Sequence, residues 1–163
     1  MMSILVKSFL VLVLCIGLIS IAGLTGILFK LWPTSIFDKS ILVTEDTIAQ
    51  LDGLKKQVKF VPDATRFYPG APNEEVRAQA EAGINLLLED LIRGLPSNPR
   101  KSFVLQTFKE VLPSYDRFDS EERDQALSYL ERIMIITGTD GSGELLNVWR
   151  YGFPYGLLYR RGA

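Results

Sequence analysis

The sequence predicts an all-α protein, an irregular bundle of four or five short helices preceded by one N-terminal transmembrane helix. Residues 8–29 form an apolar run without a charged residue. After residue 44, apolar residues recur at spacings of three and four, the period of an amphipathic helix. Residues that cap or end helices separate these segments, and no alternating strand pattern occurs.

The apolar run Ser8–Phe29 has the length and composition of a transmembrane helix. At about 1.5 Å per residue it rises about 33 Å, and the hydrocarbon core of a bilayer is about 30 Å thick. Lys7 and Lys30 bound the run and Trp32 follows it, which suits the headgroups and the interface. We therefore expect residues 1–32 to be a membrane anchor whose partner is the lipid bilayer.

Two alternatives for this run stay open. In the first it is a cleaved signal peptide, with Met1–Lys7 as the charged n-region and Ser20-Ile21-Ala22 as the cleavage site. However, the run stays apolar through Ile27–Phe29, where a signal peptide would become polar. In the second it is a buried helix of a soluble protein, although such helices are rarely apolar on every face.

The charges that flank the run decide its orientation only weakly. Lys7 and the α-amine lie on one side, and Lys30 and Lys39 lie on the other, so the positive-inside rule gives little preference. The usual orientation of an N-terminal signal-anchor places the rest of the chain outside the cytoplasm. We expect a single-pass membrane protein with a linker at residues 33–43 and one helical domain at residues 44–163.

The first predicted helix of this domain covers residues 45–57. Thr44 is a suitable N-cap, and Glu45 and Asp46 lie in the first turn, where the helix dipole favours negative charge. One apolar stripe follows the helical period: Ile48, Leu51, Leu54 and Val58.

Residues 59–72 contain three prolines and a glycine, and this density of helix breakers excludes a regular helix. Four apolar or aromatic residues lie in the same segment: Phe60, Val61, Phe67 and Tyr68. Because exposing so much apolar surface to water is unfavourable, we expect this loop to lie across the bundle.

The second predicted helix begins after the N-cap Asn73 and ends at Gly94. Gly83 inside it costs about 1 kcal/mol relative to alanine, which indicates a close helix crossing. Its apolar stripe is the most regular in the domain: Val76, Ala80, Ile84, Leu87, Leu88 and Leu91.

Two further helices follow. The third begins at Asn98-Pro99, with proline at the first helical position, and ends at Pro113. The fourth is capped by Asp119 or Ser120 and stops at Gly138.

The residue types present exclude several kinds of catalysis. The chain has no histidine, and its one cysteine, Cys15, lies in the apolar run. A Ser-His-Asp triad, a Cys–His pair and a zinc site of His or Cys are therefore impossible within one chain. We expect no metal and no cofactor. The 18 Lys and Arg residues balance 19 Asp and Glu without a basic stripe, so we expect no nucleic-acid partner.

The densest group of charges is Asp119–Asp124, at the start of the fourth predicted helix. Helical spacing places Glu122 and Arg123 on the side that faces the core. In the structural interpretation, Asp119 and Glu122 form a capping box, and Arg123 pairs with a carboxylate across the bundle. In the functional interpretation, the same residues form the polar floor of a cleft.

The residues that we expect to bind a partner are aromatic, arginine or asparagine, types that anchor binding surfaces. They come from the proline-containing loop, from the fourth helix and from a short fifth helix predicted at residues 144–151. The set is Arg66, Tyr68, Arg123, Asn147, Trp149, Arg150 and Tyr151. In a final helix, the same residue types can instead seal a small core.

These observations lead to two hypotheses of function. The first is a membrane-tethered module that binds a protein or ligand through this aromatic and arginine surface. The alternative is a carboxylate-based hydrolase of an envelope polymer, with Glu122 as the acid and Asp119 or Asp116 as its partner. That chemistry requires Glu122 to open into a cleft with a second carboxyl about 5–10 Å away.

Several short motifs also resemble a known family. They are Phe60-Val61-Pro62, Asp119–Arg123, and Leu146-Asn147 with Trp149 and Tyr151-Gly152-Phe153. Over roughly residues 45–155, the chain is similar to small bacterial proteins whose family is known only as a domain of unknown function. The resemblance implies a compact, mainly helical domain, and it implies no activity, ligand or catalytic residue.

Overall fold

The structure, a computed structural model of the chain, describes residues 11–17, 20, 32, 34–36 and 38–152. After residue 44 the described residues form five α-helices and two 3₁₀ turns, without a β-strand. The helices are α2 (Glu45–Lys56), α3 (Glu74–Gly94), α4 (Lys101–Val111), α5 (Ser120–Thr137) and α6 (Leu145–Tyr151), and the turns are η1 (Ala64–Arg66) and η2 (Leu112–Tyr115). The predicted all-α domain is therefore confirmed.

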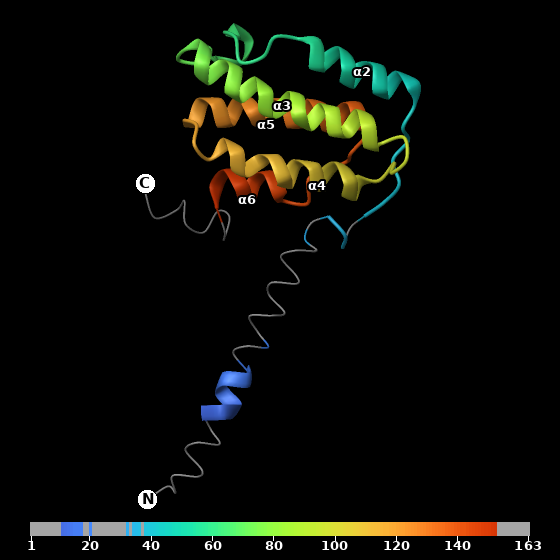
Figure 1. Cartoon of the computed structure of the whole chain (residues 1–163), viewed down its shortest axis with the longest axis vertical. Coiled ribbons are helices and arrows are strands. Elements are labelled where there is room, and N and C mark those ends of the chain that lie inside the picture. The colour runs from blue at the N-terminus through green and yellow to red at the C-terminus, as the bar shows by residue number, and fades with distance from the viewer. Residues whose placement is uncertain (1–10, 18–19, 21–31, 33, 37, 153–163) are drawn as a thin grey trace, which may run out of the picture.

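Helix α3 is the centre of the bundle (Figure 1). In this view α2 lies above α3, α4 lies below it, and α5 lies behind it. Helix α3 packs against all three of these helices, and α5 also contacts α2 and η2. This arrangement brings the loop between α2 and α3 to the same end of the bundle as the start of α5 (Figure 1).

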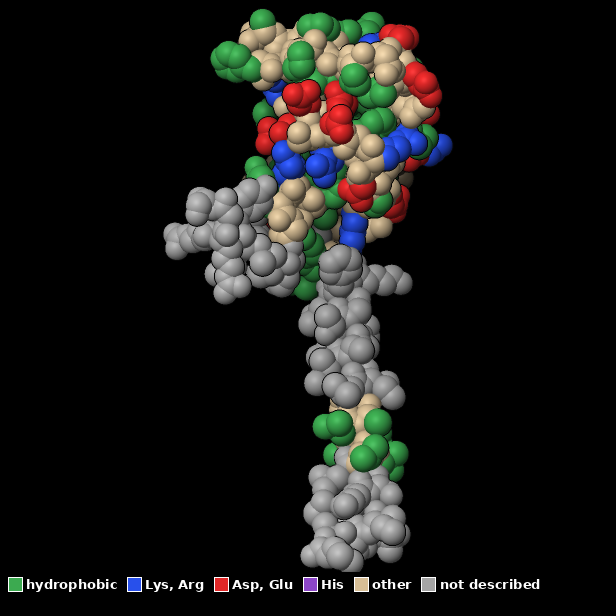
Figure 2. All heavy atoms as spheres, turned by 90° about the vertical axis from the view of Figure 1, so that its left-hand side faces the viewer, with side chains coloured by type: hydrophobic (Ala, Val, Ile, Leu, Met, Phe, Trp, Pro, Cys, Tyr) green, Lys and Arg blue, Asp and Glu red, His purple; other side chains and the backbone are tan. Residues whose placement is uncertain are grey.

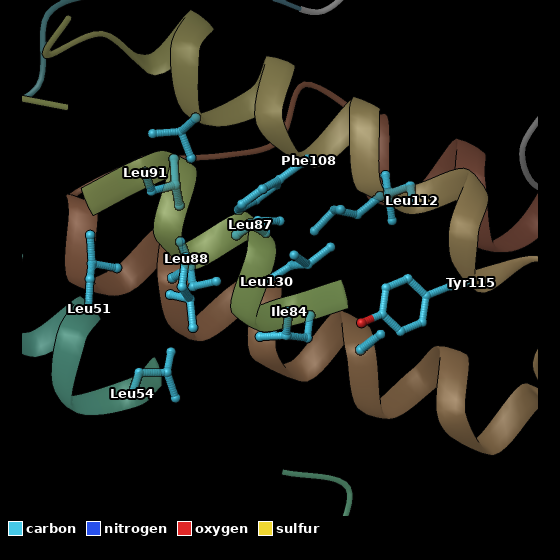
Figure 3. Packing of buried hydrophobic residues seen from close by; sticks show 14 of the residues in the cluster. Leu51, Leu54, Ile84, Leu87, Leu88, Leu91, Phe108, Leu112, Tyr115 and Leu130 are labelled. Atoms are coloured by element: carbon cyan, nitrogen blue, oxygen red, sulfur yellow. The ribbon is translucent and has the colours of Figure 1, made fainter. Parts of the chain in front are cut away.

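The core is filled by side chains from α2, α3, α4, α5 and η2 (Figure 3). Most residues of the predicted stripes are buried, and α3 contributes the largest set: Ala80, Ile84, Leu87, Leu88 and Leu91. Val58 differs from the prediction, since its side chain is 62% exposed. The reason is that α2 ends at Lys56, so Val58 no longer follows the helical period.

The helix ends follow the predicted capping residues in three places. The Thr44 side chain accepts a hydrogen bond from the Thr47 N–H at the start of α2, and Asn73 accepts one from the Val76 N–H at the start of α3. Gly138 ends α5 in the left-handed conformation, with φ of 68°. Local sequence therefore determines these three ends.

The start of α4 differs from the prediction, because the helix begins at Lys101 and not at Pro99. The backbone before it is hydrogen-bonded to a distant segment. The Ile41 N–H donates to the Pro99 carbonyl (3.0 Å), and the Lys101 N–H donates to the Lys39 carbonyl (2.9 Å). We call residues 38–43 the strap. This part of the predicted linker 33–43 is thus bonded to the helical domain.

The prediction of a close contact at Gly83 is confirmed, but the group that approaches α3 there is a side chain and not a second helix. Tyr115 of η2 is buried against α3, and its hydroxyl donates to the Ala80 carbonyl. A Cβ atom added at Gly83 would lie 2.7 Å from the Tyr115 hydroxyl oxygen. The glycine therefore leaves room for the tyrosine, whose ring is labelled in Figure 3.

The N-terminal apolar run lies mostly outside the described residues. Within it, residues 11–17 and 20 are helical, and their side chains are exposed. Among the described residues, no helix combines the length and the apolar character that crossing a membrane requires. The predicted span Ser8–Phe29 is therefore neither confirmed nor contradicted.

Candidate functional site

The loop between α2 and α3 ends in a closed tip, residues 63–68, which we call the tip loop. Asp63 and Tyr68 pair as an antiparallel bridge, with backbone N–H to carbonyl distances of 2.9 and 3.0 Å. The Asp63 carboxylate also accepts hydrogen bonds from the backbone and hydroxyl of Thr65, at 2.9 and 2.6 Å. All six residues thus belong to one hydrogen-bonded turn: Asp63 and Phe67 flank η1, and Tyr68 closes the turn by pairing with Asp63. These bonds fix the backbone of the tip.

Phe67 lies at this tip, and its side chain is 95% exposed. Its backbone is left-handed, with φ of 54°. That conformation is unfavourable for a bulky residue, at a cost of about 1–3 kcal/mol, and an exposed ring regains none of it by burial. The sequence prediction that the whole loop lies across the bundle is therefore wrong for Phe67, although Phe60 and Tyr68 are buried.

Tyr68 and Glu122 connect the tip loop to α5. Both side chains are buried, and the Tyr68 hydroxyl donates a hydrogen bond to the Glu122 carboxylate at 3.3 Å. Burial, together with the negative charge of Glu122, raises the pKa of Tyr68 well above its usual value of 10.0. Tyr68 thus stays a neutral hydrogen-bond donor, and its contact with Glu122 holds the tip loop against α5.

Lys59, at the start of the loop between α2 and α3, is fully buried and fixes that end of the loop. Its ammonium group donates to the carbonyls of Lys55 and Gln57, at 3.0 and 2.8 Å, and to the Asn85 side chain at 2.7 Å. Burial lowers the pKa of Lys59 below its usual value. The three hydrogen bonds satisfy this charge and join the end of α2 to α3.

A hollow of about 160 Å³ lies between the tip loop and α5, and we call it the tip hollow. The loop contributes one wall and one face of α5 contributes the other. The lining residues are Arg66, Phe67, Tyr68 and Pro69 from the loop, and Glu121, Asp124, Gln125 and Ser128 from α5. The predicted residues Arg66 and Tyr68 are thus brought together with Glu121 and Asp124 of the predicted charge cluster, whereas Gln125 and Ser128 were not predicted from the sequence.

Helix α6 reaches the same region through Arg150, whose guanidinium forms a two-pronged ion pair with Asp124 (Nη2–Oδ2 3.0 Å). Trp149 points elsewhere, since its indole N–H donates to Asp116 at 2.9 Å and its ring packs against the core. Tyr151 is 42% exposed. The final helix therefore both seals the core and presents polar side chains to solvent.

Asn147 stays local to α6, since its amide donates to Glu144 at 2.8 Å. The capping box predicted for α5 is wrong. Asp119 is the N-cap, yet its side chain makes no capping hydrogen bond, and the carboxylate of Glu122 accepts its hydrogen bond from Tyr68. The ion pair predicted for Arg123 is also absent among the described residues, and its Nε atom is buried without a hydrogen-bond partner.

The residues of the hydrolase hypothesis are placed apart from the hollows that the structure describes. Glu122 is only 2% exposed and lines neither the tip hollow nor a second hollow between α3 and α4. Asp116 accepts the Trp149 hydrogen bond. In the described part of the chain, no group of three or more acidic or cysteine side chains is arranged to hold a metal ion. Catalysis by Glu122 stays a prediction that these contacts do not favour.

Comparison with known proteins agrees with this fold. The model of the family described as a domain of unknown function (DUF4844) matches residues 42–154. A crystal structure of a DUF3571 family protein from Acinetobacter baumannii is similar, with a TM-score of 0.60 and 27% sequence identity, over 65% of this chain and 89% of that chain. A search of curated proteins gave no match. These findings confirm the resemblance to a bacterial family of unknown function.

Proposed function

This chain belongs to the DUF4844 family, a domain of unknown function, and we propose that it is a membrane-tethered module that binds a partner protein through the tip loop. The observation that carries the proposal is Phe67, a bulky side chain that combines a left-handed backbone with 95% exposure. Both features work against stability, so the residue is best explained by a contact made with another molecule.

The surroundings of Phe67 fit an interface with a protein. Val58 and Val61 of the same loop are also exposed, at 62% and 41%. In Figure 2 hydrophobic side chains gather at the upper end of the molecule, where Figure 1 shows this loop, and charged side chains of both signs lie below them. An apolar centre with a polar rim is the usual composition of a protein–protein interface.

The rigidity of the tip loop also favours binding. Because the Asp63–Tyr68 bridge and the Asp63–Thr65 hydrogen bonds hold the backbone, little conformational entropy is lost when Phe67 enters a pocket. Tyr68 adds to this support through its buried contact with Glu122. The loop thus presents an aromatic anchor in a fixed orientation.

The membrane tether is supported by the uncharged run Ser8–Phe29 and by its described part. Residues 11–17 form a helix whose apolar side chains are exposed, a surface that lipid would cover. We propose that the helical domain lies outside the cytoplasm. Protease added to intact spheroplasts should then degrade the domain, and full protection would reverse the orientation.

Site-specific photocrosslinking in native membranes tests the binding function. Benzoylphenylalanine is placed at position 67 of the full chain, and a matched control carries it at Ile135, another strongly exposed apolar position, on α5 (81%). We expect a discrete crosslinked product from position 67 that the control at position 135 does not give. The product should also disappear in the presence of excess unlabelled wild-type chain, since binding sites are saturable.

Two outcomes contradict the proposal. Equal products from both positions would show that any exposed apolar side chain is labelled, without a specific interface. A complete lack of product from position 67, with the chain present in the membrane at normal abundance, would show that Phe67 contacts no protein there.

A further inference from the structure

The tip hollow contains a polar side chain that forms no hydrogen bond with another described residue. Gln125 lines this hollow and is only 7% exposed. Among the described residues, no group forms a hydrogen bond with its side-chain amide. Its amide atoms reach the hollow and are not sealed in the core, since among the described residues the buried side-chain polar atom without a partner is Arg123 Nε. The hollow therefore offers an unpaired amide to a group that enters it.

The charges around Gln125 indicate the chemistry of that group. Glu121 is exposed and forms no ion pair with a described residue, and Asp124 keeps a 57% exposed side chain beside its Arg150 partner. Two cations lie near these carboxylates: Arg66, whose Nε atom lies 3.9 Å from the Asp63 carboxylate, and Arg150, whose guanidinium pairs with Asp124. Because Arg150 already pairs with Asp124, the α5 wall offers the Glu121 carboxylate and the Gln125 amide oxygen as acceptors, which a group rich in N–H donors would match.

The volume of the tip hollow and its aromatic wall further limit the kind of ligand that it can bind. A hollow of about 160 Å³ is smaller than the roughly 300–1,000 Å³ of sites for drug-sized molecules and cofactors. It suits a single side chain. Phe67 forms part of the opposite wall, and a guanidinium group can stack on an aromatic ring while it donates to carboxylates.

We infer that the tip hollow binds an arginine side chain of the partner protein, with its guanidinium donating to Glu121 and to the Gln125 amide oxygen. The inference rests on the proposed function, because it places the arginine beside the Phe67 anchor. The amide nitrogen of Gln125 remains available to a carbonyl of the partner backbone.

An NMR titration tests this inference on the ¹⁵N-labelled full chain in detergent micelles. The probe is N-acetyl-arginine methylamide, and the matched control is N-acetyl-citrulline methylamide, which has nearly the same shape without the charge. The side-chain amide signals of Gln125 are assigned by their loss in Gln125→Leu. We expect these signals to shift saturably with the arginine probe, at an affinity about tenfold above that of the citrulline probe.

Variants identify the groups that bind. Glu121→Gln should weaken the arginine probe about fivefold, whereas Glu131→Gln, an exposed carboxylate farther along α5, should leave the affinity unchanged. Equal affinities for the two probes would overturn the inference. So would saturable shifts of other NMR signals while the Gln125 side-chain signals stay unchanged. So would an unchanged affinity in Glu121→Gln.

Failure of this inference is distinguishable from failure of the proposed function. The crosslinking experiment at position 67 is repeated with Glu121→Gln and Gln125→Leu combined. A crosslinked product of undiminished yield would contradict the arginine site, but the tip loop would still be a binding surface. A loss of product in this double variant, with normal abundance in the membrane, supports the arginine site.

Discussion

At the scale of single residues, Lys59 shows how a charge is buried without a carboxylate partner. Its ammonium group donates to two carbonyls at the end of α2 and to Asn85 of α3. These carbonyls belong to a helix end, where backbone acceptors lack intrahelical partners and a positive charge is favoured by the helix dipole. Lys59 therefore acts as a cap for α2 that is supplied by the following loop.

Replacing Lys59 with methionine should lower the free energy of unfolding by about 2 kcal/mol. The aliphatic stem is retained, but three buried acceptors lose their donor. The matched control is Lys56→Met, which removes an exposed lysine of the same helix and should change stability by less than about 0.5 kcal/mol. Urea denaturation of the full chain in detergent measures both. Equal effects of the two substitutions would contradict the capping role.

At the scale of the helices, α3 is positioned by the contact between Gly83 and Tyr115. The buried tyrosine ring occupies the space where a Cβ atom of residue 83 would lie. Gly53 of α2 is a natural counterpart, because an added Cβ atom there meets nothing within 4 Å. Gly83 is therefore explained by packing, whereas no neighbour within 4 Å explains Gly53.

Alanine at these two positions should have opposite effects. Gly53→Ala should stabilise the protein by up to about 1 kcal/mol, which is the difference in helix propensity. Gly83→Ala should destabilise it by about 1–2 kcal/mol, since the strain of overpacking outweighs the same gain. Thermal unfolding followed by circular dichroism compares them. A stabilised Gly83→Ala variant would show that Tyr115 can move aside.

The sequence predicted most elements because their ends depend on local residues. Thr44, Asn73 and Gly138 each cap a helix through contacts within a few residues. The start of α4 was misplaced because the groups around Pro99 pair with residues 39–41, far away in the sequence. No local pattern reports such a pairing.

The candidate site was predictable in part for the same reason. Aromatic and arginine residues marked the right loop, and Arg66 and Tyr68 do lie beside the tip hollow. The sequence did not separate Phe60 from Phe67, although one is fully buried and the other is 95% exposed. That difference depends on how the loop turns back on itself. Gln125 was missed because an amide on a helix face carries no pattern until its neighbours are known.

At the scale of the whole molecule, the strap holds the chain before α2 against the rest of the bundle. Asp140, which follows α5, pairs with Lys39 of the strap and with Lys101 of α4 (Nζ–Oδ1 2.9 Å). The hydrogen bonds from Lys39 and Lys101 lower the pKa of Asp140 to about 2, from an ordinary value of 3.8. This carboxylate therefore connects three segments that are distant in sequence.

The stability that Asp140 contributes should depend on pH in acid. Because its pKa is lower in the folded state, the contribution is fully present above pH 3.8 and is lost as the pH falls toward 2. The melting temperature of Asp140→Asn should lie below that of the wild type at pH 6, and the two should converge near pH 2. Lys39→Met in the Asp140→Asn background should have little further effect at pH 6. A difference that persists at pH 2 would contradict this assignment.

The central claim is that Phe67 is retained for binding at a cost to the fold, and its glycine variant tests this most directly. Phe60 is the internal comparison, since it has nearly the same backbone (φ 57° against 54°) but is fully buried against Tyr115 and Tyr129. Glycine relieves the left-handed backbone at both positions. The measurement is the free energy of unfolding of Phe67→Gly in the full chain, with Phe60→Gly alongside. We predict that Phe67→Gly is as stable as the wild type or more stable by up to about 2 kcal/mol, whereas Phe60→Gly loses about 3 kcal/mol or more. A loss of more than about 1 kcal/mol in Phe67→Gly would contradict the account, because it would show that the exposed ring supports the fold.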